Sequence, residues 1–354
     1  MLYQTENQHG GDVYGGGITL DFSANTNPLG TPPGVLEAVR RGLPQLHRYP
    51  DPYCRQLVQA IAAHEQVPAS YVLCGNGAAD LIYAYCAALR PRTAAEPAPT
   101  FAEYGLGLAQ VGCRVAPYFL HQAENFDVGE GFLPFLEAKK PEVVFLCTPN
   151  NPTGRLLPLP LLEQILQGCA AWGARVFLDE CFLDLTEDGI SAKSLLAAHP
   201  ELLILKAFTK SYGMAGIRLG YCLCADSTLL RRMASASQPW NVSSLAQSAG
   251  VAALAEQDFL QRTRSLVHTE RLWLTDSLTA LGFWVCPSQA NYLLFRGPRG
   301  LREGLLRQGI AIRGCGNYSG LDDGWYRIAV RPHEENEALI TAIRQFCKER
   351  SLWQ

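Results

Sequence analysis

Short apolar runs of strand length recur along the first two thirds of the chain and alternate with helical patterns. They lie near residues 71–74, 94–98, 113–119, 143–147, 175–179, 202–208 and 217–223. Strands that alternate with helices indicate a mostly parallel sheet covered by helices on both faces. The sequence therefore predicts an α/β fold that binds its ligands where the strands end.

Polar side chains follow two of these runs. The segment VVFLCTPNNPTG (143–154) places Asn151 after one strand, and RVFLDECF (175–182) places Asp179 at the tip of another. Each segment alone has an ordinary structural explanation, in which Asp179 caps a helix and NNPTG is only a turn. Their order, with a lysine in a later run, favours a shared binding site.

That lysine is Lys210 in FTKSYGMAGIRLGY (208–221), which also contains Arg218. A lysine amine can form a Schiff base with an aldehyde cofactor when its surroundings keep it unprotonated. The planar guanidinium of an arginine suits a phosphate. Pyridoxal 5'-phosphate combines an aldehyde, a pyridine and a phosphate on one ring, so it needs both residues. Asp179 would then pair with the protonated pyridine nitrogen, and Asn151 would hydrogen-bond the phenolic oxygen.

The segment VLCGNGAADLIYAYCAALR (72–90) reads as a strand, a glycine-containing turn and a helix. Backbone amides of Gly77, Ala78 and Ala79, together with the positive end of the helix dipole, would form a phosphate cradle. A dinucleotide site is the alternative, but its fingerprint is G-x-G-x-x-G, whereas GNG is followed here by AAD. The pattern therefore favours the phosphate of a smaller cofactor.

With these motifs in this order, the chain resembles the fold-type I pyridoxal phosphate enzymes of the aminotransferase class I/II superfamily along almost its whole length. The resemblance implies that Lys210 forms the Schiff base, Asp179 pairs with the pyridinium and Asn151 contacts the phenolic oxygen. It also implies that Arg218 and the amides of Ala78 and Ala79 bind the phosphate.

Two aromatic residues gain a role only through the resemblance. In PTFAEY (99–104), Phe101 falls at the position that stacks on the cofactor ring. In RYPD (48–51), Tyr49 falls where this superfamily sends a tyrosine across a dimer interface to the neighbour's cofactor phosphate. A homodimer with active sites at the interface is therefore expected.

Two positions depart from the superfamily pattern. Phe182 stands where many relatives carry a tyrosine, and Ala207 stands where a serine or threonine often contacts the phosphate. Each change removes a polar contact of about 1 kcal/mol. Thr209, next to the lysine, is expected to compensate for Ala207. These losses also motivate a different hypothesis, a binding or regulatory module that keeps only the fold. Retention of Lys210 and Asp179 favours an enzyme.

The length of 354 residues exceeds one compact core, so two domains are expected. Residues 1–40 are predicted to form an N-terminal segment that packs on the small domain, and residues 41–240 to form the large cofactor-binding domain with a seven-stranded sheet. Residues 241–354 are predicted to form a linking helix and a small α+β domain. They contain two long amphipathic stretches, the strand-like runs ANYLLFR and WYRIAV, and a final helix near 334–349.

Two arginines in the C-terminal part are candidates for the substrate site. Arg313 lies in GIAIRGCGNYSGL (309–321) and Arg327 in WYRIAVR (325–331). Two guanidiniums suggest a doubly anionic substrate, such as one with a carboxylate and a phosphate. The alternative is that one or both arginines form structural salt bridges.

These peripheral segments, together with HGGDVY (9–14) and DFSANTNPLG (21–30), resemble the threonine-phosphate decarboxylases of cobalamin biosynthesis. Histidinol-phosphate aminotransferases share the core motifs. The resemblance implies that Arg313 binds the substrate phosphate, Arg327 binds its carboxylate and Asn27 lies near the substrate. The expected reaction is decarboxylation of L-threonine O-3-phosphate to aminopropanol phosphate. Transamination between histidinol phosphate and 2-oxoglutarate is the alternative.

Composition limits the other classes of function. The net charge of −3 gives no electrostatic reason to expect nucleic acid or membrane binding. No apolar run reaches membrane-spanning length, and the first residues lack the regions of a signal peptide. The 12 cysteines are scattered without a C-x-x-C pair, so no metal site is expected and a reducing cytoplasm is favoured.

Overall fold

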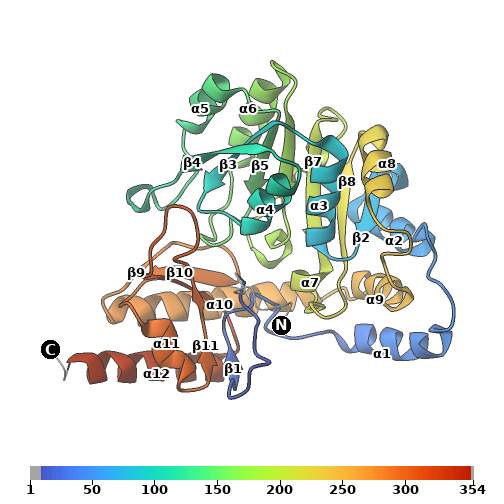
Figure 1. The fold of residues 1–354 in the computed structure, drawn as a ribbon. Coiled ribbons are helices and arrows are strands. Elements are labelled where there is room, and N and C mark those ends of the chain that lie inside the picture. The colour runs from blue at the N-terminus through green and yellow to red at the C-terminus, as the bar shows by residue number, and fades with distance from the viewer. Residues whose placement is uncertain (1–8, 352–354) are drawn as a thin grey trace.

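A computed structural model describes residues 9–351 of the chain, and its central element is a seven-stranded sheet (Figure 1). The strand order is β2-β8-β7-β6-β5-β3-β4. Only β8 runs antiparallel to its neighbours, so the expected mostly parallel sheet is confirmed. Its strands are β2 (Val72–Gly75), β3 (Thr93–Ala98), β4 (Arg114–Phe119), β5 (Val143–Cys147), β6 (Arg175–Asp179), β7 (Leu202–Ala207) and β8 (Gly220–Cys224).

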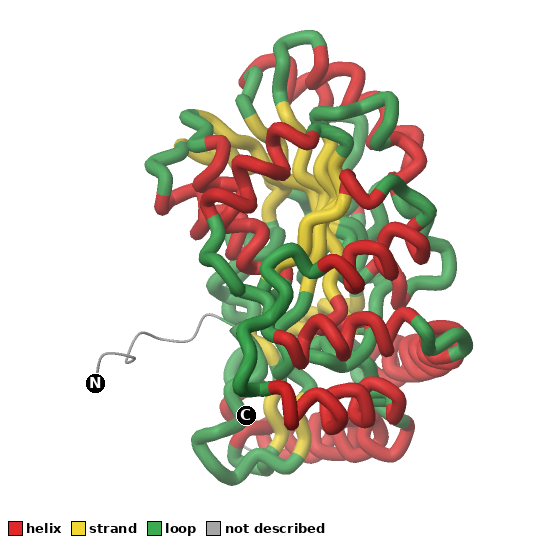
Figure 2. The backbone as a smooth tube through the Cα atoms, turned by 90° about the vertical axis from the view of Figure 1, so that its right-hand side faces the viewer, coloured by secondary structure: helices red, strands yellow, loops and turns green. Residues whose placement is uncertain are grey.

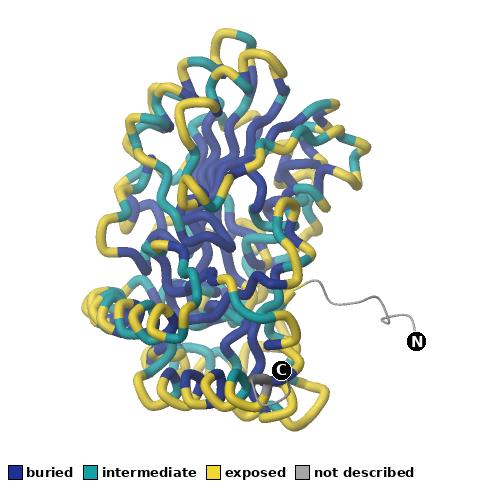
Figure 3. The backbone as a smooth tube through the Cα atoms, turned by 90° about the vertical axis from the view of Figure 1, so that its left-hand side faces the viewer, coloured by how far each residue is buried: buried dark blue, intermediate teal, exposed yellow. Residues whose placement is uncertain are grey.

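Helices cover both faces of this sheet (Figure 2). Alternate residues of β5 point to opposite faces, so Val144 and Leu146 join one hydrophobic cluster, whereas Val143 and Phe145 join the other. The first face is covered by α2 (Arg55–Glu65), α5 (Phe132–Lys139), α6 (Leu159–Ala170) and α9 (Ser244–Leu254). The second is covered by α3 (Ala78–Leu89), α4 (Ala102–Gln110) and α8 (Ser227–Ala236). Burial on both faces explains why these strands are continuous apolar runs (Figure 3).

The C-terminal part contains a second, smaller sheet of strand order β12-β13-β10-β9, in which every pair is antiparallel. Its elements are α10 (Phe259–Ala280), β9 (Trp284–Val285), β10 (Tyr292–Arg296), α11 (Leu301–Leu306), β11 (Ile310–Ala311), β12 (Arg313–Gly314), β13 (Trp325–Ala329) and α12 (His333–Ser351). A separate hydrophobic cluster fills the space between this sheet, α10 and α12.

The N-terminal segment joins the two parts of the chain. Strand β1 (Leu20–Asp21) pairs in parallel with β11, and α1 (Pro33–Gly42) packs against α9. Residues 1–8 of the predicted N-terminal segment lie outside the described residues. The domain boundaries at residues 40 and 240 remain a prediction. Within residues 9–351, no helix is long and apolar enough to cross a membrane.

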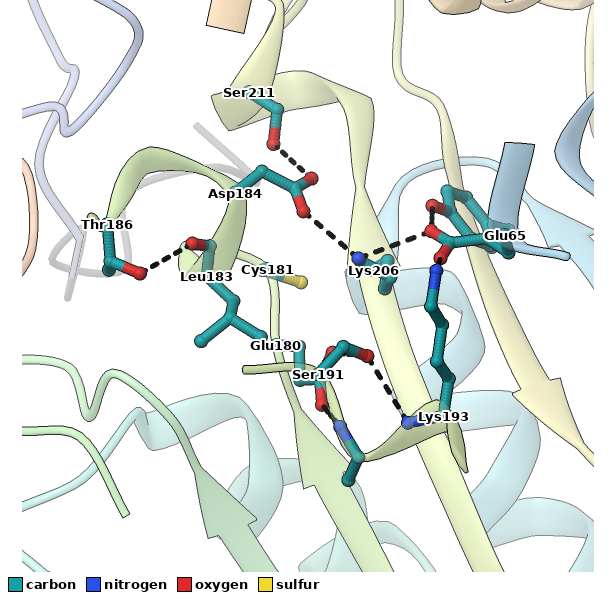
Figure 4. A network of polar contacts seen from close by, with 12 residues as sticks. Glu65, Glu180, Cys181, Leu183, Asp184, Thr186, Ser191, Lys193, Lys206 and Ser211 are labelled. Carbon is teal, nitrogen blue, oxygen red and sulfur yellow. Dashed lines mark hydrogen bonds and ion pairs between the residues drawn. The ribbon is translucent and has the colours of Figure 1, made fainter. Parts of the chain in front are cut away.

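Beneath the carboxyl ends of the strands lies a buried network of charged residues (Figure 4). Lys206 on β7 places its Nζ 3.2 Å from Glu65 Oε1 and 3.0 Å from Asp184 Oδ1. Burial alone would lower the pKa of Lys206, but Asp184 and Glu65 raise it above its ordinary value. Burial would raise the pKa of Glu65, yet Lys206, with Tyr221 and Lys193, lowers it to about 2. Both groups are therefore charged near neutral pH.

Removal of the Lys206 amine should cost substantial stability, because Glu65 and Asp184 would keep their charges without their shared partner. We expect Lys206→Met to lower the free energy of unfolding by about 3–5 kcal/mol, measured by urea denaturation. Lys193→Met is the matched control, since Lys193 also contacts Glu65 but its side chain is 33% exposed. Its loss should be about 1 kcal/mol or less. Equal effects of the two variants would contradict this account of the network.

Candidate active site

A cavity of about 430 Å³ lies at the carboxyl ends of β5, β6 and β7, between the large sheet and the C-terminal part. Most of the residues that the sequence singled out line it. These are Ala78, Ala79, Phe101, Asn151, Asp179, Thr209, Lys210, Arg218, Arg313 and Arg327. The position agrees with the rule that α/β sheets bind ligands at strand ends.

Lys210 lies in α7 (Phe208–Ser211), the short helix that follows β7. Its Nζ is 5.7 Å from the centre of the Phe182 ring. Burial, followed by the positive charges of Arg327 and Arg218, lowers the pKa of Lys210 to about 8. A sizeable fraction of this amine is therefore unprotonated near neutral pH, as a nucleophile requires.

Asp179 ends β6 and is almost fully buried. Its Oδ2 accepts a hydrogen bond of 2.6 Å from the Tyr104 hydroxyl, and its Oδ1 accepts one of 2.8 Å from the Cys181 amide. Burial raises the pKa of Asp179, while these hydrogen bonds lower it. A cation bound beside this carboxylate would offset the cost of its burial.

Asn151 and Arg327 lie in direct contact. Arg327 Nη1 donates to Asn151 Oδ1 at 2.5 Å, and Arg327 Nη2 donates to the Ser23 carbonyl at 2.8 Å. The amide oxygen of Asn151 is thus engaged, which leaves its NH₂ group to donate to a ligand. The contact also ties the C-terminal part to the end of β5.

The start of α3 forms a cradle for an anion. Ala78 and Ala79 are its first residues, and no side chain caps it. Gly77 has a φ of 84°, and a Cβ there would lie 2.7 Å from Arg218 Nη2. Gly77 thus lies against Arg218, and only glycine allows that guanidinium to approach the turn. The dipole, the amides and the guanidinium together suit a phosphate.

Arg313 and Arg327 are cross-strand partners in the β12–β13 pair. This register explains why both side chains reach one cavity, since residues directly opposite in an antiparallel pair share a face. Arg313 Nη2 donates to Asn317 Oδ1 at 2.7 Å, and its guanidinium lies over the Tyr318 ring at 5.5 Å.

Two predicted site residues lie elsewhere. Asn27 is buried outside the cavity, where its Nδ2 donates to the Ser211 carbonyl and to Thr263 Oγ1, so its predicted substrate contact is not supported. Asn25 lines the cavity instead. Tyr49 is 79% exposed and stacks on Trp240 at 4.6 Å, away from this chain's cavity. Its expected role across a dimer interface remains a prediction.

Other lining residues were missed by the sequence reasoning. Tyr104 lies three residues after Phe101 on α4 and could have been noticed from that spacing, because residues three apart share a helix face. His9 reaches the cavity from the N-terminal segment, where its Nε2 lies 2.6 Å from Glu103 Oε1. No local pattern pointed to the His9–Glu103 pair.

This set of residues fits pyridoxal phosphate. Lys210 supplies an amine of lowered pKa, Asp179 supplies a buried carboxylate for the pyridine nitrogen, and the start of α3 with Arg218 suits the phosphate. Phe101 lines the cavity as expected of a ring-stacking residue. Phe182 offers no hydroxyl, and its ring packs edge-on against Tyr292.

The lowered pKa of Lys210 predicts a pH dependence. Covalent attachment of pyridoxal phosphate to the cofactor-free protein requires the neutral amine, so its rate should rise with pH and level off above about pH 8. Arg327→Gln removes one of the charges that lower this pKa, so the midpoint should move to higher pH. Arg327→Lys keeps the charge and should leave the midpoint near that of the wild type. Stopped-flow absorbance of the cofactor measures the rate, and an identical midpoint in all three proteins would refute the electrostatic origin of the shift.

Comparisons with known proteins agree with this geometry. Residues 18–343 match the family described as aminotransferase class I and II. Threonine-phosphate decarboxylase of Salmonella typhimurium is 40% identical over 92% of this chain and 90% of its own length. Histidinol-phosphate aminotransferase of Symbiobacterium thermophilum is 31% identical over 92% of this chain and 90% of its own length.

The fold is also similar to solved structures. The histidinol-phosphate aminotransferase from Clostridium acetobutylicum superposes with a TM-score of 0.86 at 26% identity, covering 92% of this chain and 98% of that one. The family match spans most of the chain, and it includes the segments that contribute Asp179, Lys210 and Arg327 to the cavity. The resemblance inferred from the motifs is thereby confirmed, and the chain belongs to the class I and II aminotransferase family.

Proposed function

We propose that this protein is a pyridoxal phosphate-dependent decarboxylase that converts L-threonine O-3-phosphate into aminopropanol phosphate and carbon dioxide. One observation carries the proposal: Arg313 and Arg327 oppose each other across β12 and β13 and line the same cavity as Lys210. Two cations beside one nucleophilic amine match a substrate with two anionic groups. The similarity to the Salmonella decarboxylase supports the choice.

The proposed cofactor ligands divide the work among them. When bound, pyridoxal phosphate supplies an electron sink for the electron pair left by a breaking bond at the substrate Cα. Asp179 stabilises a proton on the pyridine nitrogen, and the Asn151 NH₂ donates to the phenolic oxygen. Gly77, Ala78, Ala79 and Arg218 bind the phosphate, Phe101 stacks on the ring, and Thr209 adds a polar contact near Lys210.

The two arginines would select the bond that breaks. Arg327 binds the substrate carboxylate, and Arg313 binds the substrate phosphate at the other end of the molecule. Fixing both ends sets the rotation about Cα, so the bond to the carboxylate can stand perpendicular to the ring plane. Orientation of this kind contributes to rate because the reacting groups are positioned before the reaction.

Lys210 would act as the proton carrier. A lysine with a pKa of about 8 can both release and accept a proton near neutral pH. After carbon dioxide leaves, Lys210 Nζ donates its proton to Cα. In an aminotransferase of the histidinol-phosphate type, the same amine would instead remove the proton from Cα. Both reactions therefore use the same residues.

A paired assay of the cofactor-loaded protein tests the proposal. One sample contains L-threonine phosphate and is followed for carbon dioxide and aminopropanol phosphate. The other contains histidinol phosphate with 2-oxoglutarate and is followed for glutamate. We expect carbon dioxide from the first sample alone. Glutamate from the second alone would overturn the decarboxylase assignment and favour the aminotransferase.

A variant links this assay to the cavity. Arg313→Gln should raise KM for L-threonine phosphate by about tenfold to a hundredfold, because a charge-assisted contact to the phosphate is lost. Any activity with unphosphorylated L-threonine should change little. An equal loss for both substrates would mean that Arg313 does not bind the phosphate.

The proposal extends to assembly and compartment. We propose a homodimer in which Tyr49 reaches the cofactor phosphate of the neighbouring subunit, and the exposure of Tyr49 in a single chain supports it. Sedimentation of a monomer at assay concentration would contradict this. We propose a cytoplasmic location, since no disulfide joins the twelve cysteines of the described chain.

A further inference from the structure

Two asparagines of the segment DFSANTNPLG lie in opposite environments. Asn27 is 1% exposed, and its amide is fully used: Nδ2 donates to the Ser211 carbonyl and to Thr263 Oγ1, both at 2.8 Å, and Oδ1 accepts from the Leu29 amide at 2.8 Å. Asn25 is 2% exposed, yet neither atom of its side-chain amide has a hydrogen-bond partner among residues 9–351.

A buried amide without partners is costly, because it has given up its hydrogen bonds to water and gained none in return. Asn25 lines the cavity that contains Lys210 and Arg327. Its backbone is held in place, since its carbonyl accepts from Asn291 Nδ2 at 3.3 Å. The amide is therefore a fixed polar group at the cavity wall, and its chemistry suits a ligand that both accepts and donates hydrogen bonds.

The neighbours of Asn25 indicate which part of a ligand it meets. Ser23, two residues earlier, accepts a hydrogen bond from Arg327 Nη2 through its carbonyl. Arg327 Nε is a second buried donor without a partner within the described chain. The anionic group that satisfies Arg327 would thus lie beside the strand segment that carries Asn25.

We propose that Asn25 is a substrate-binding residue, whose Nδ2 donates to the carboxylate that Arg327 also binds. The inference rests on the proposed function for the identity of the substrate. An amino acid offers carboxylate oxygens to the Asn25 NH₂ group and an amine donor to its Oδ1. Asn25 carries no charge, so it contributes alignment of the carboxylate without adding another cation that would oppose its departure as neutral carbon dioxide.

A comparison of Asn25→Ala with Asn27→Ala separates ligand binding from a structural role. In the cofactor-free protein, Asn25→Ala removes a polar group that has no partner, so the thermal midpoint should stay within about 2 °C of the wild type. Asn27→Ala removes three hydrogen bonds, so its midpoint should fall by about 5–10 °C. The affinity for pyridoxal phosphate should be unchanged in Asn25→Ala.

The second measurement identifies the substrate group. Asn25→Ala should raise KM for L-threonine phosphate about tenfold or more and leave the inhibition constant of aminopropanol phosphate, which lacks the carboxylate, nearly unchanged. If the wild type proves to be an aminotransferase, the same contrast applies to glutamate, which has a carboxylate, and histidinol phosphate, which has none. A failure of the proposed function thus shows in the wild type, separately from a failure of this inference.

Three results would overturn the inference. The first is a fall in thermal midpoint for Asn25→Ala as large as that for Asn27→Ala. The second is weaker binding of pyridoxal phosphate by Asn25→Ala. The third is an equal effect on ligands with and without the carboxylate.

Discussion

The hydrogen bonds between β5, β6 and β7 set the geometry on which the cavity depends. The Thr148 amide donates to the Asp179 carbonyl at 2.8 Å, and the Glu180 amide donates to the Leu205 carbonyl at 2.9 Å. These bonds align the three strands so that they end together. The turn that carries Asn151, the side chain of Asp179 and the short helix that carries Lys210 consequently meet at one edge of the sheet.

Two lysines four residues apart show how their surroundings control charge. Lys206 is buried between Glu65 and Asp184, which raise its pKa and keep it protonated. Lys210 has also left water, but Arg327 and Arg218 are near it and its pKa falls to about 8. The first lysine stabilises the fold, and the second is available for chemistry. Asp184 connects the two regions, because it also accepts a hydrogen bond of 3.0 Å from Ser211, the neighbour of Lys210.

The sequence predicted the strands well because strands buried on both faces are continuous apolar runs, and the runs at 143–147 and 175–179 match β5 and β6. It could not predict contacts that depend on packing. The Tyr104 hydroxyl reaches Asp179 across 75 residues of chain. The motif around Asn27 also did not reveal which of two neighbouring asparagines faces the cavity, since that depends on how the segment packs against Ser211 and Thr263.

The central claim is that Lys210 alone, among the lysines near the cavity, reacts with the cofactor aldehyde. Borohydride reduction of the pyridoxal phosphate-loaded protein, followed by proteolysis and mass spectrometry, tests it directly. The account predicts a single labelled peptide with the modification on Lys210, because its amine is the one that burial and nearby cations leave unprotonated. Label on Lys206, or no labelled peptide at all, would contradict the account.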